Sequence, residues 1–151
     1  MSSYVKHFSE LKVYQKQREL ARAVFDVTKT FPKEERFSLT DQIRRSSRSI
    51  GAQIAEAWAK RLYPKHFVAK LSDADGEQQE TQHWITEAAD CSYISLETAE
   101  DLATLCTEIG RMLGAMIKKA DTFAKPDYKL QEEELPYLPT SDSRLNADSE
   151  N

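Results

Sequence analysis

The sequence contains few of the residues that build loop-rich, cross-linked or repetitive proteins. Its 151 residues include 4 glycines, 5 prolines and 2 cysteines. The low glycine and proline content excludes collagen-like and low-complexity chains. Two cysteines cannot supply a disulfide framework or a four-ligand zinc site, so we do not expect a disulfide-stapled secreted protein. The composition is that of one soluble domain with one hydrophobic core.

Long apolar stretches are also missing. No uncharged apolar run approaches the roughly 18 residues that a membrane span requires. Lys6 and His7, near the start, are followed by no apolar segment of the kind found in secretory signals. We therefore expect a cytoplasmic protein with no membrane attachment.

Charge is distributed unevenly along the chain. Lysine and arginine number 21, and aspartate and glutamate number 25, so the formal net charge is −4. Residues 1–70 carry 15 basic and 7 acidic groups, whereas residues 71–151 carry 6 basic and 18 acidic groups. A uniformly basic nucleic-acid-binding protein is excluded, but the first half of the chain still has enough basic groups for a basic face.

Hydrophobic periodicity predicts four amphipathic helices. Apolar residues recur at intervals of three and four over about residues 8–30, 38–61, 64–92 and 96–123. At 1.5 Å per residue each helix is about 30 to 45 Å long, and the connections between them are short. The sequence therefore predicts an all-α protein in which residues 1–123 form an antiparallel up-down-up-down four-helix bundle.

Four local patterns refine this prediction. The first helix has a second apolar stripe, which indicates burial on more than one side; it consists of Leu11, Tyr14, Ala21 and Phe25. Ser38 and Asp41 fit a capping box at the start of the second helix. Small residues around Gly51 predict close approach by a neighbouring helix. Gly76, in the polar middle of the third helix, predicts a kink or a close approach there.

Residues 124–151 have a different composition from the bundle. They contain three prolines, seven acidic groups and only three basic groups. We expect this acidic tail to be disordered, with Leu135, Tyr137 and Leu138 as a small segment that could dock on a partner.

The sequence contains no complete signature of an enzyme. A di-metal carboxylate site in a bundle needs a Glu-x-x-His motif on each of two helices, and Glu80 with His83 supplies only one. Nucleophile–base pairs and glycine-rich phosphate loops are missing as well. Cys91 and Cys106 are separated along the helices by more than 10 Å on helical geometry, so we expect buried, reduced thiols. We predict a protein without catalytic activity, metal or cofactor.

The strongest positive feature is a basic set on the second helix and the start of the third. Arg44 and Arg48 share a helix face by their four-residue spacing, and Arg45 lies beside them. Guanidinium groups bind phosphates through paired donors. The candidate nucleic-acid-binding residues are Arg44, Arg45, Arg48, Lys60, Arg61 and Lys65.

The same basic residues have a second interpretation, as partners of acidic side chains within or between subunits. Glu56, Glu77 and Glu80 are the candidate partners, and we expect Glu56 and Glu80 to form structural ion pairs. Charged groups on helices most often serve this purpose.

Several motifs occur between residues 8 and 123 in one combination. They are Phe8-x-x-Leu11-x-Val13-Tyr14-Gln15, Phe31-Pro32-x-x-Glu35, Leu39-Thr40-x-Gln42-x-Arg44-Arg45, Ser49-Ile50-x-x-x-Ile54-Ala55-Glu56 and Glu108-Ile109-x-Arg111-Met112-Leu113. This combination resembles the bacterial four-helix bundle proteins encoded in 23S rRNA intervening sequences. The chain departs from the family pattern at Gly51, Gln53 and Ala57, which stand where the family has proline, asparagine and glycine.

The resemblance implies an up-down bundle that assembles as a homopentamer, with the second stripe of the first helix supplying subunit contacts. A related branch, the accessory protein of diversity-generating retroelements, binds nucleic acid and a reverse transcriptase. Our leading hypothesis is a non-enzymatic homo-oligomeric bundle that binds structured RNA or DNA through the basic face of the second helix. The competing hypothesis is a protein-interaction scaffold, in which the acidic tail docks a protein partner and the arginines serve only the assembly.

Overall fold

The computed structural model describes residues 5–124, and the regular structure in that range is helical. The four long helices are α1 (Lys12–Thr28), α2 (Leu39–Ala59), α3 (Pro64–Asp90) and α4 (Leu96–Lys118). Two short 3-10 helices precede α1 and α2, at Phe8–Glu10 and Lys33–Glu35. Residues 120–124 are again helical after a turn at Lys119.

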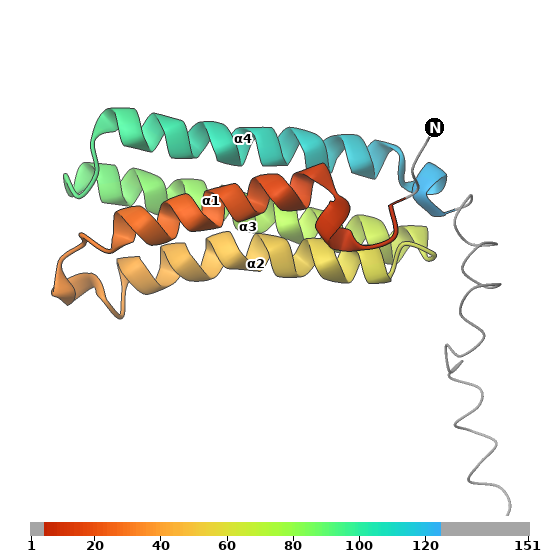
Figure 1. Ribbon diagram of the computed structural model, residues 1–151, viewed down its shortest axis with the longest axis horizontal. Coiled ribbons are helices and arrows are strands. Elements are labelled where there is room, and N and C mark those ends of the chain that lie inside the picture. Colours follow the sequence, from red (N-terminus) through yellow and green to blue (C-terminus); the bar gives the residue numbers. More distant parts are fainter. Residues whose placement is uncertain (1–4, 125–151) are drawn as a thin grey trace, which may run out of the picture.

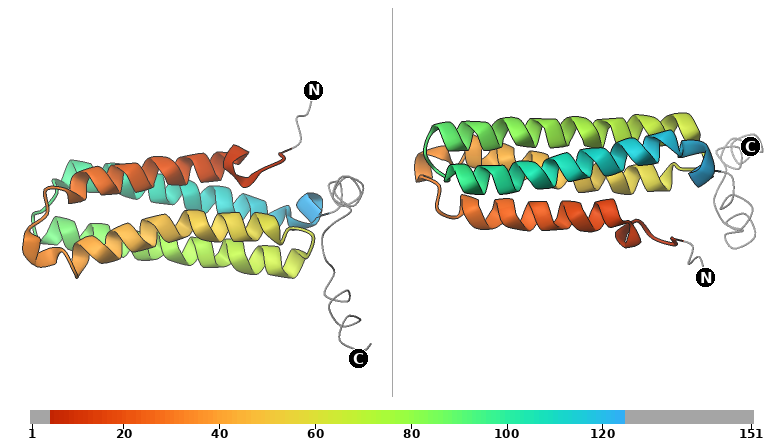
Figure 2. Two further views of the ribbon diagram at one scale, coloured as in Figure 1. Left: turned by 60° about the horizontal axis from the view of Figure 1, so that its bottom comes forward. Right: turned by 90° about the horizontal axis from the view of Figure 1, so that it is seen from above.

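The helices form an antiparallel bundle in which each helix runs opposite to the one before it (Figure 1). Contacts join α2 to α3, α3 to α4, and α1 to both α2 and α4, so the four helices enclose one core (Figure 2). This arrangement confirms the predicted all-α up-down bundle. None of the helices described is long and apolar enough to cross a membrane. Except for Ala124, the predicted acidic tail lies outside the described residues.

The start of the first helix and the capping of the second differ from the prediction. The first helix begins at Lys12 rather than at residue 8, because Leu11 is extended and separates it from the 3-10 turn. The second helix begins as predicted, next to Ser38, but the capping box is wrong because the Ser38 side chain makes no capping bond. Instead, the Glu35 carboxylate accepts hydrogen bonds from the Leu39 N–H, at 3.2 Å, and from the Ser38 hydroxyl, at 3.1 Å.

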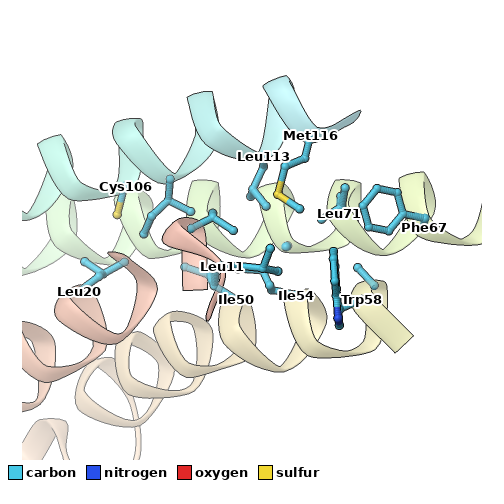
Figure 3. Close-up of a cluster of buried hydrophobic side chains, with 14 of the residues drawn as sticks. Leu11, Leu20, Ile50, Ile54, Trp58, Phe67, Leu71, Cys106, Leu113 and Met116 are labelled. Carbon is cyan, nitrogen blue, oxygen red and sulfur yellow. The ribbon is translucent and has the colours of Figure 1, made fainter. Parts of the chain in front are cut away.

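The main hydrophobic core receives side chains from all four helices (Figure 3), and a smaller cluster of Phe31, Leu39 and Ala88 lies apart from it. Ile50 and Ile54 of α2 are fully buried, as are Phe67 of α3 and Leu113 of α4. Buried aliphatic and aromatic side chains of this size contribute about 1.5–3 kcal/mol each to folding. The regular spacing of apolar residues in the sequence therefore does identify the core-facing side of each helix.

A layer of buried polar side chains interrupts this core near its middle. The Thr81 hydroxyl donates to the Ser46 hydroxyl at 2.9 Å, and the Gln17 Nε2 donates to the Ser47 carbonyl oxygen at 2.9 Å. These bonds join α3 to α2 and α1 to α2. The polar middle of α3 thus faces two environments, because Gln78 and Thr81 are buried whereas other polar side chains of that segment are exposed.

Two glycines accommodate the buried glutamines of this layer. A Cβ atom at Gly51 would lie 2.5 Å from Oε1 of Gln17, and one at Gly110 would lie 2.8 Å from Nε2 of Gln78. The predicted close approach at Gly51 is confirmed, with a glutamine side chain as the approaching group. No atom lies within 4 Å of a Cβ at Gly76, so the close approach considered for that residue is wrong, and α3 continues through it.

Candidate nucleic-acid interface

A surface groove of about 500 Å³ lies between α1 and α2. Its lining residues are Phe8, Tyr14, Gln17, Arg18, Ala21, Arg22, Phe25, Arg48, Gly51, Ala52 and Ala55. The charged lining residues are all arginines, and the others, apart from Gln17, are small or aromatic; we call these small and aromatic residues the floor of the groove. We call this surface the α1–α2 groove. It contains three of the four residues predicted as the second apolar stripe of the first helix.

Two arginines of α2 lie over one exposed aromatic ring of α1. The Arg44 guanidinium lies 4.8 Å from the centre of the Phe25 ring, and that of Arg48 lies 5.9 Å from it. Nε of Arg44 also donates a hydrogen bond to the Thr28 hydroxyl at 2.7 Å. The ring and this hydrogen bond hold the two guanidinium groups of α2 against α1. Cation–π contacts of this kind are worth about 0.5–1 kcal/mol at exposed sites.

Four arginines, which we call the groove arginines, lie in or beside this groove: Arg18, Arg22 and Arg48 line it, and Arg44 contacts Phe25, which also lines it. Within residues 5–124, none of the four forms an ion pair. Like charges that are not neutralised create a positive potential over a concave surface, and this potential attracts anions. The groove has the chemistry of a phosphate-binding surface, because arginine presents planar, paired donors.

Arg45, the predicted neighbour of Arg44, lies on a different face. Its guanidinium forms ion pairs with the carboxylates of Glu77, at 3.5 Å, and Glu80. Its Nε also donates to the Gln42 side-chain oxygen at 3.2 Å. The α2–α3 face thus neutralises Arg45 within the chain, which corresponds to the second interpretation of the basic set.

The remaining predicted residues lie at the far end of α2. Lys60 follows Arg48 by twelve residues, about 18 Å along a helix. Lys60 and Lys65 are exposed there. Arg61 is only 5% exposed, because its guanidinium stacks on the Trp58 ring at 4.2 Å and donates to the Trp58 carbonyl oxygen at 2.9 Å. The structure therefore does not bring the six predicted basic residues together in one patch.

Two further ion pairs connect the helices. The Lys70 ammonium lies 2.9 Å from the Glu56 carboxylate, and this hydrogen bond raises the pKa of Lys70. The Lys16 ammonium lies 3.2 Å from the Glu108 carboxylate, which likewise raises the pKa of Lys16. The first pair joins α3 to α2 and the second joins α1 to α4. The charges of these side chains are therefore neutralised within the bundle.

The residues considered for metal or redox chemistry are dispersed. Among residues 5–124, no group of three His, Cys, Asp or Glu side chains is close enough to hold a metal ion. Glu80 is paired with Arg45, and His83 packs against the Trp84 ring. Both cysteines are free, as predicted, but Cys91 is exposed at the end of α3, so its predicted burial is wrong. Cys106 is buried, and burial raises the pKa of its thiol to about 12.

Sequence reasoning missed Arg18 and Arg22 as site residues. Both belong to α1, and their four-residue spacing places them on one face beside Ala21 and Phe25. The sequence contained a signal, because the second apolar stripe is interleaved with these arginines. The basic run in α2 was more conspicuous, and only the packing of α1 on α2 shows that the two sets meet.

Comparison with known proteins places the fold in a family. No curated protein matches the chain. A family model described as 23S rRNA-intervening sequence protein matches residues 9–115. The chain is also similar to a crystal structure, that of a protein with unknown function from the S23 ribosomal protein family of Bacteroides thetaiotaomicron VPI-5482. The two are 34% identical with a TM-score of 0.64, and the match covers 70% of this chain and 95% of the other.

The family match includes all of α1, α2 and α3 and most of α4. It therefore contains both long helices that line the α1–α2 groove. The residues that carried the resemblance in the sequence lie in α1, α2 and α4, in the segment before α1 and in the connection between α1 and α2. On this evidence the chain belongs to the family of 23S rRNA-intervening sequence proteins.

Proposed function

We propose that this protein is a non-enzymatic, oligomeric helical bundle that binds structured RNA or DNA through the phosphate backbone. The observation that carries the proposal is the set of four groove arginines, three of which line one groove and none of which has an acidic partner in the described chain. The implied relationship to a nucleic-acid-binding accessory protein supports the same function. Arg44 and Arg48 remain from the predicted site, and Arg18 and Arg22 join them.

Backbone binding of this kind has a characteristic dependence on salt. Each phosphate that an arginine neutralises releases condensed counterions, so the logarithm of the affinity falls linearly with the logarithm of the salt concentration, by about 0.9 per contact on a duplex. Phosphate contacts carry little sequence information. We therefore expect tight binding at low salt, weak binding at high salt and little preference for sequence.

The first test removes the positive charge of the groove at two exposed positions. Arg22→Glu combined with Arg48→Glu should weaken binding of a fluorescein-labelled RNA hairpin by roughly 100-fold or more at low salt, because two contacts become repulsive. Neither side chain donates a hydrogen bond within residues 5–124, so helical content by circular dichroism should not change. A DNA hairpin of the same sequence distinguishes RNA binding from general phosphate binding.

A matched control separates the groove from total charge. Arg36→Glu combined with Arg111→Glu gives the same net charge on exposed side chains outside the groove. This control should reduce binding much less than the groove variant. Equal losses in the two variants, or no binding by the unmodified protein at low salt, would instead favour the protein-interaction scaffold.

We propose that the homo-oligomer forms through the opposite edge of the bundle. Leu96 is 76% exposed, and it lines a second groove, between α3 and α4, together with Ile85, Ala89, Ala99 and Ala103. The apolar stripe of α1 was predicted to supply subunit contacts, but its exposed ring, Phe25, lies beneath arginines that have no acidic partners. Burying those arginines between subunits would require carboxylates from the neighbouring copy.

Light scattering tests this placement of the subunit contact. Leu96→Glu should lower the mass of the assembly, because a charge would be buried in an apolar contact. Arg22→Glu with Arg48→Glu should leave the mass unchanged. If the groove variant dissociates the assembly and Leu96→Glu does not, the α1–α2 groove is a subunit interface.

A further inference from the structure

The α1–α2 groove presents two chemistries to a ligand. Arg18, Arg22 and Arg48, which we call the rim, provide positive charge, whereas Tyr14 and Ala52 belong to the small and aromatic floor. A phosphate backbone can pair with the arginines of the rim, but it offers no apolar group to pack against the floor. A peptide in which carboxylates adjoin apolar side chains would satisfy both parts of the groove.

The chain itself contains such a peptide outside the described residues. Glu132, Glu133 and Glu134 are followed directly by Leu135-Pro136-Tyr137-Leu138. The family match ends at residue 115, before this segment begins. The segment thus lies outside the part of the chain that the family model matches, and its charge is opposite to that of the groove.

The end of the bundle lies within reach of the groove. Phe123 packs on Trp58, with 6.2 Å between ring centres, and Ala124 is buried. Arg48 lies ten residues from Trp58 on α2, which is about 15 Å along the helix. The eight residues from Ala124 to Glu132 span up to roughly 26 Å when extended, so the acidic run can reach the arginines.

We propose that residues 132–138 of this chain dock in the α1–α2 groove. The three glutamates pair with the groove arginines, and the apolar residues that follow them cover the aromatic and alanine floor. The segment then occupies the phosphate-binding surface, so a nucleic acid must displace it to bind. The regulatory part of this proposal rests on the proposed function of the groove, whereas the docking itself does not.

Hydrogen exchange of the full-length protein without nucleic acid tests the docking. Backbone amides of residues 132–138 should exchange about tenfold more slowly than those of a synthetic peptide of the same sequence, because a docked segment is shielded from water. Arg22→Glu with Arg48→Glu should abolish this protection, and Arg36→Glu with Arg111→Glu should preserve it. Exchange at the rate of the peptide overturns the proposal, and so does protection of the groove alone, which would indicate another occupant such as a second copy.

Matched tail variants test the competition with nucleic acid. Replacing Glu132, Glu133 and Glu134 by glutamine should tighten binding of the RNA hairpin by about three- to tenfold at low salt. Asp142→Asn with Asp148→Asn and Glu150→Gln removes the same charge from the tail and should change binding less. Equal tightening by both triple variants overturns the docked segment in favour of a general effect of tail charge.

Hydrogen exchange and hairpin binding test the docking and the proposed function separately. A protected segment in a protein that does not bind either hairpin would retain the docking and refute the proposed function. Binding of RNA by a protein whose tail exchanges freely would retain the function and refute the docking.

Discussion

Arg45 and Arg48 lie three residues apart on α2, less than one helical turn, yet their electrostatic surroundings differ. Arg45 faces α3 and is neutralised by Glu77 and Glu80. Arg48 faces α1, where its guanidinium lies 5.9 Å from the centre of the Phe25 ring and where further arginines line the groove. The neighbouring helix, rather than the basic run itself, decides whether an arginine is used for stability or is available for an anion.

This comparison extends to the two faces of α2 as a whole. The α2–α3 face contains the ion pairs of Arg45 and the Lys70–Glu56 pair. The α1–α2 face is lined by arginines, and the sequence of α1 contributes no carboxylate to the groove. Most acidic residues of the chain follow residue 70. Carboxylates of α3 and α4 therefore neutralise the basic side chains that they contact on α1 and α2, and the arginines of the α1–α2 face stay unpaired within the described part of the chain.

The largest expected effect on stability concerns the floor of the groove. Gly51→Ala would place a Cβ atom 2.5 Å from Oε1 of the buried Gln17. We expect a loss of about 1–3 kcal/mol in the free energy of unfolding, because Gln17 must give up its bond to the Ser47 carbonyl oxygen. Chemical denaturation measures this change.

A second substitution checks the cause of that loss. In a Gln17→Ala background the space beside Gly51 is free, so Gly51→Ala should be neutral or stabilising by up to roughly 1 kcal/mol through helix propensity. The same loss in both backgrounds would show that the close approach of Gln17 is not responsible.

A smaller effect is expected on the paired face. Arg45→Gln removes the ion pairs with Glu77 and Glu80, whose side chains are 23% and 39% exposed. Because the pairs are partly solvated, we expect a loss of only about 0.5 kcal/mol in the free energy of unfolding, and a smaller one at high salt. A loss of several kcal/mol would mean that this cluster is effectively buried, and would weaken the contrast with the groove.

The sequence predicted the fold well because helical periodicity reports directly on burial. Ile50, Ile54 and Phe67 all lie in the core, as their spacing indicated. Helix ends were less certain: Glu35 rather than Asp41 interacts with Ser38, because the 3-10 turn brings the Glu35 carboxylate to the start of α2. A capping pattern does not show which of two nearby carboxylates reaches the helix.

The candidate site was harder to predict, because residues of two helices form it and because it depends on which arginines have acidic partners. The sequence placed Arg44, Arg45 and Arg48 together, but only the packing of α3 shows that Arg45 is neutralised. Arg61 was one of the predicted binding residues, whereas its guanidinium stacks on the Trp58 ring. Buried polar contacts such as Thr81 with Ser46 also depend on helix register, which hydrophobic periodicity does not fix.

The most direct test of this account compares Arg48→Gln with Arg45→Gln in binding of the labelled RNA hairpin over a range of salt concentrations. The two variants change the net charge equally and lie on the same helix. We predict that Arg48→Gln weakens binding and lowers the magnitude of the log–log salt slope by about one, whereas Arg45→Gln leaves the slope unchanged. Equal slopes for the two variants, or a larger loss for Arg45→Gln, would contradict the assignment of phosphate binding to the α1–α2 groove.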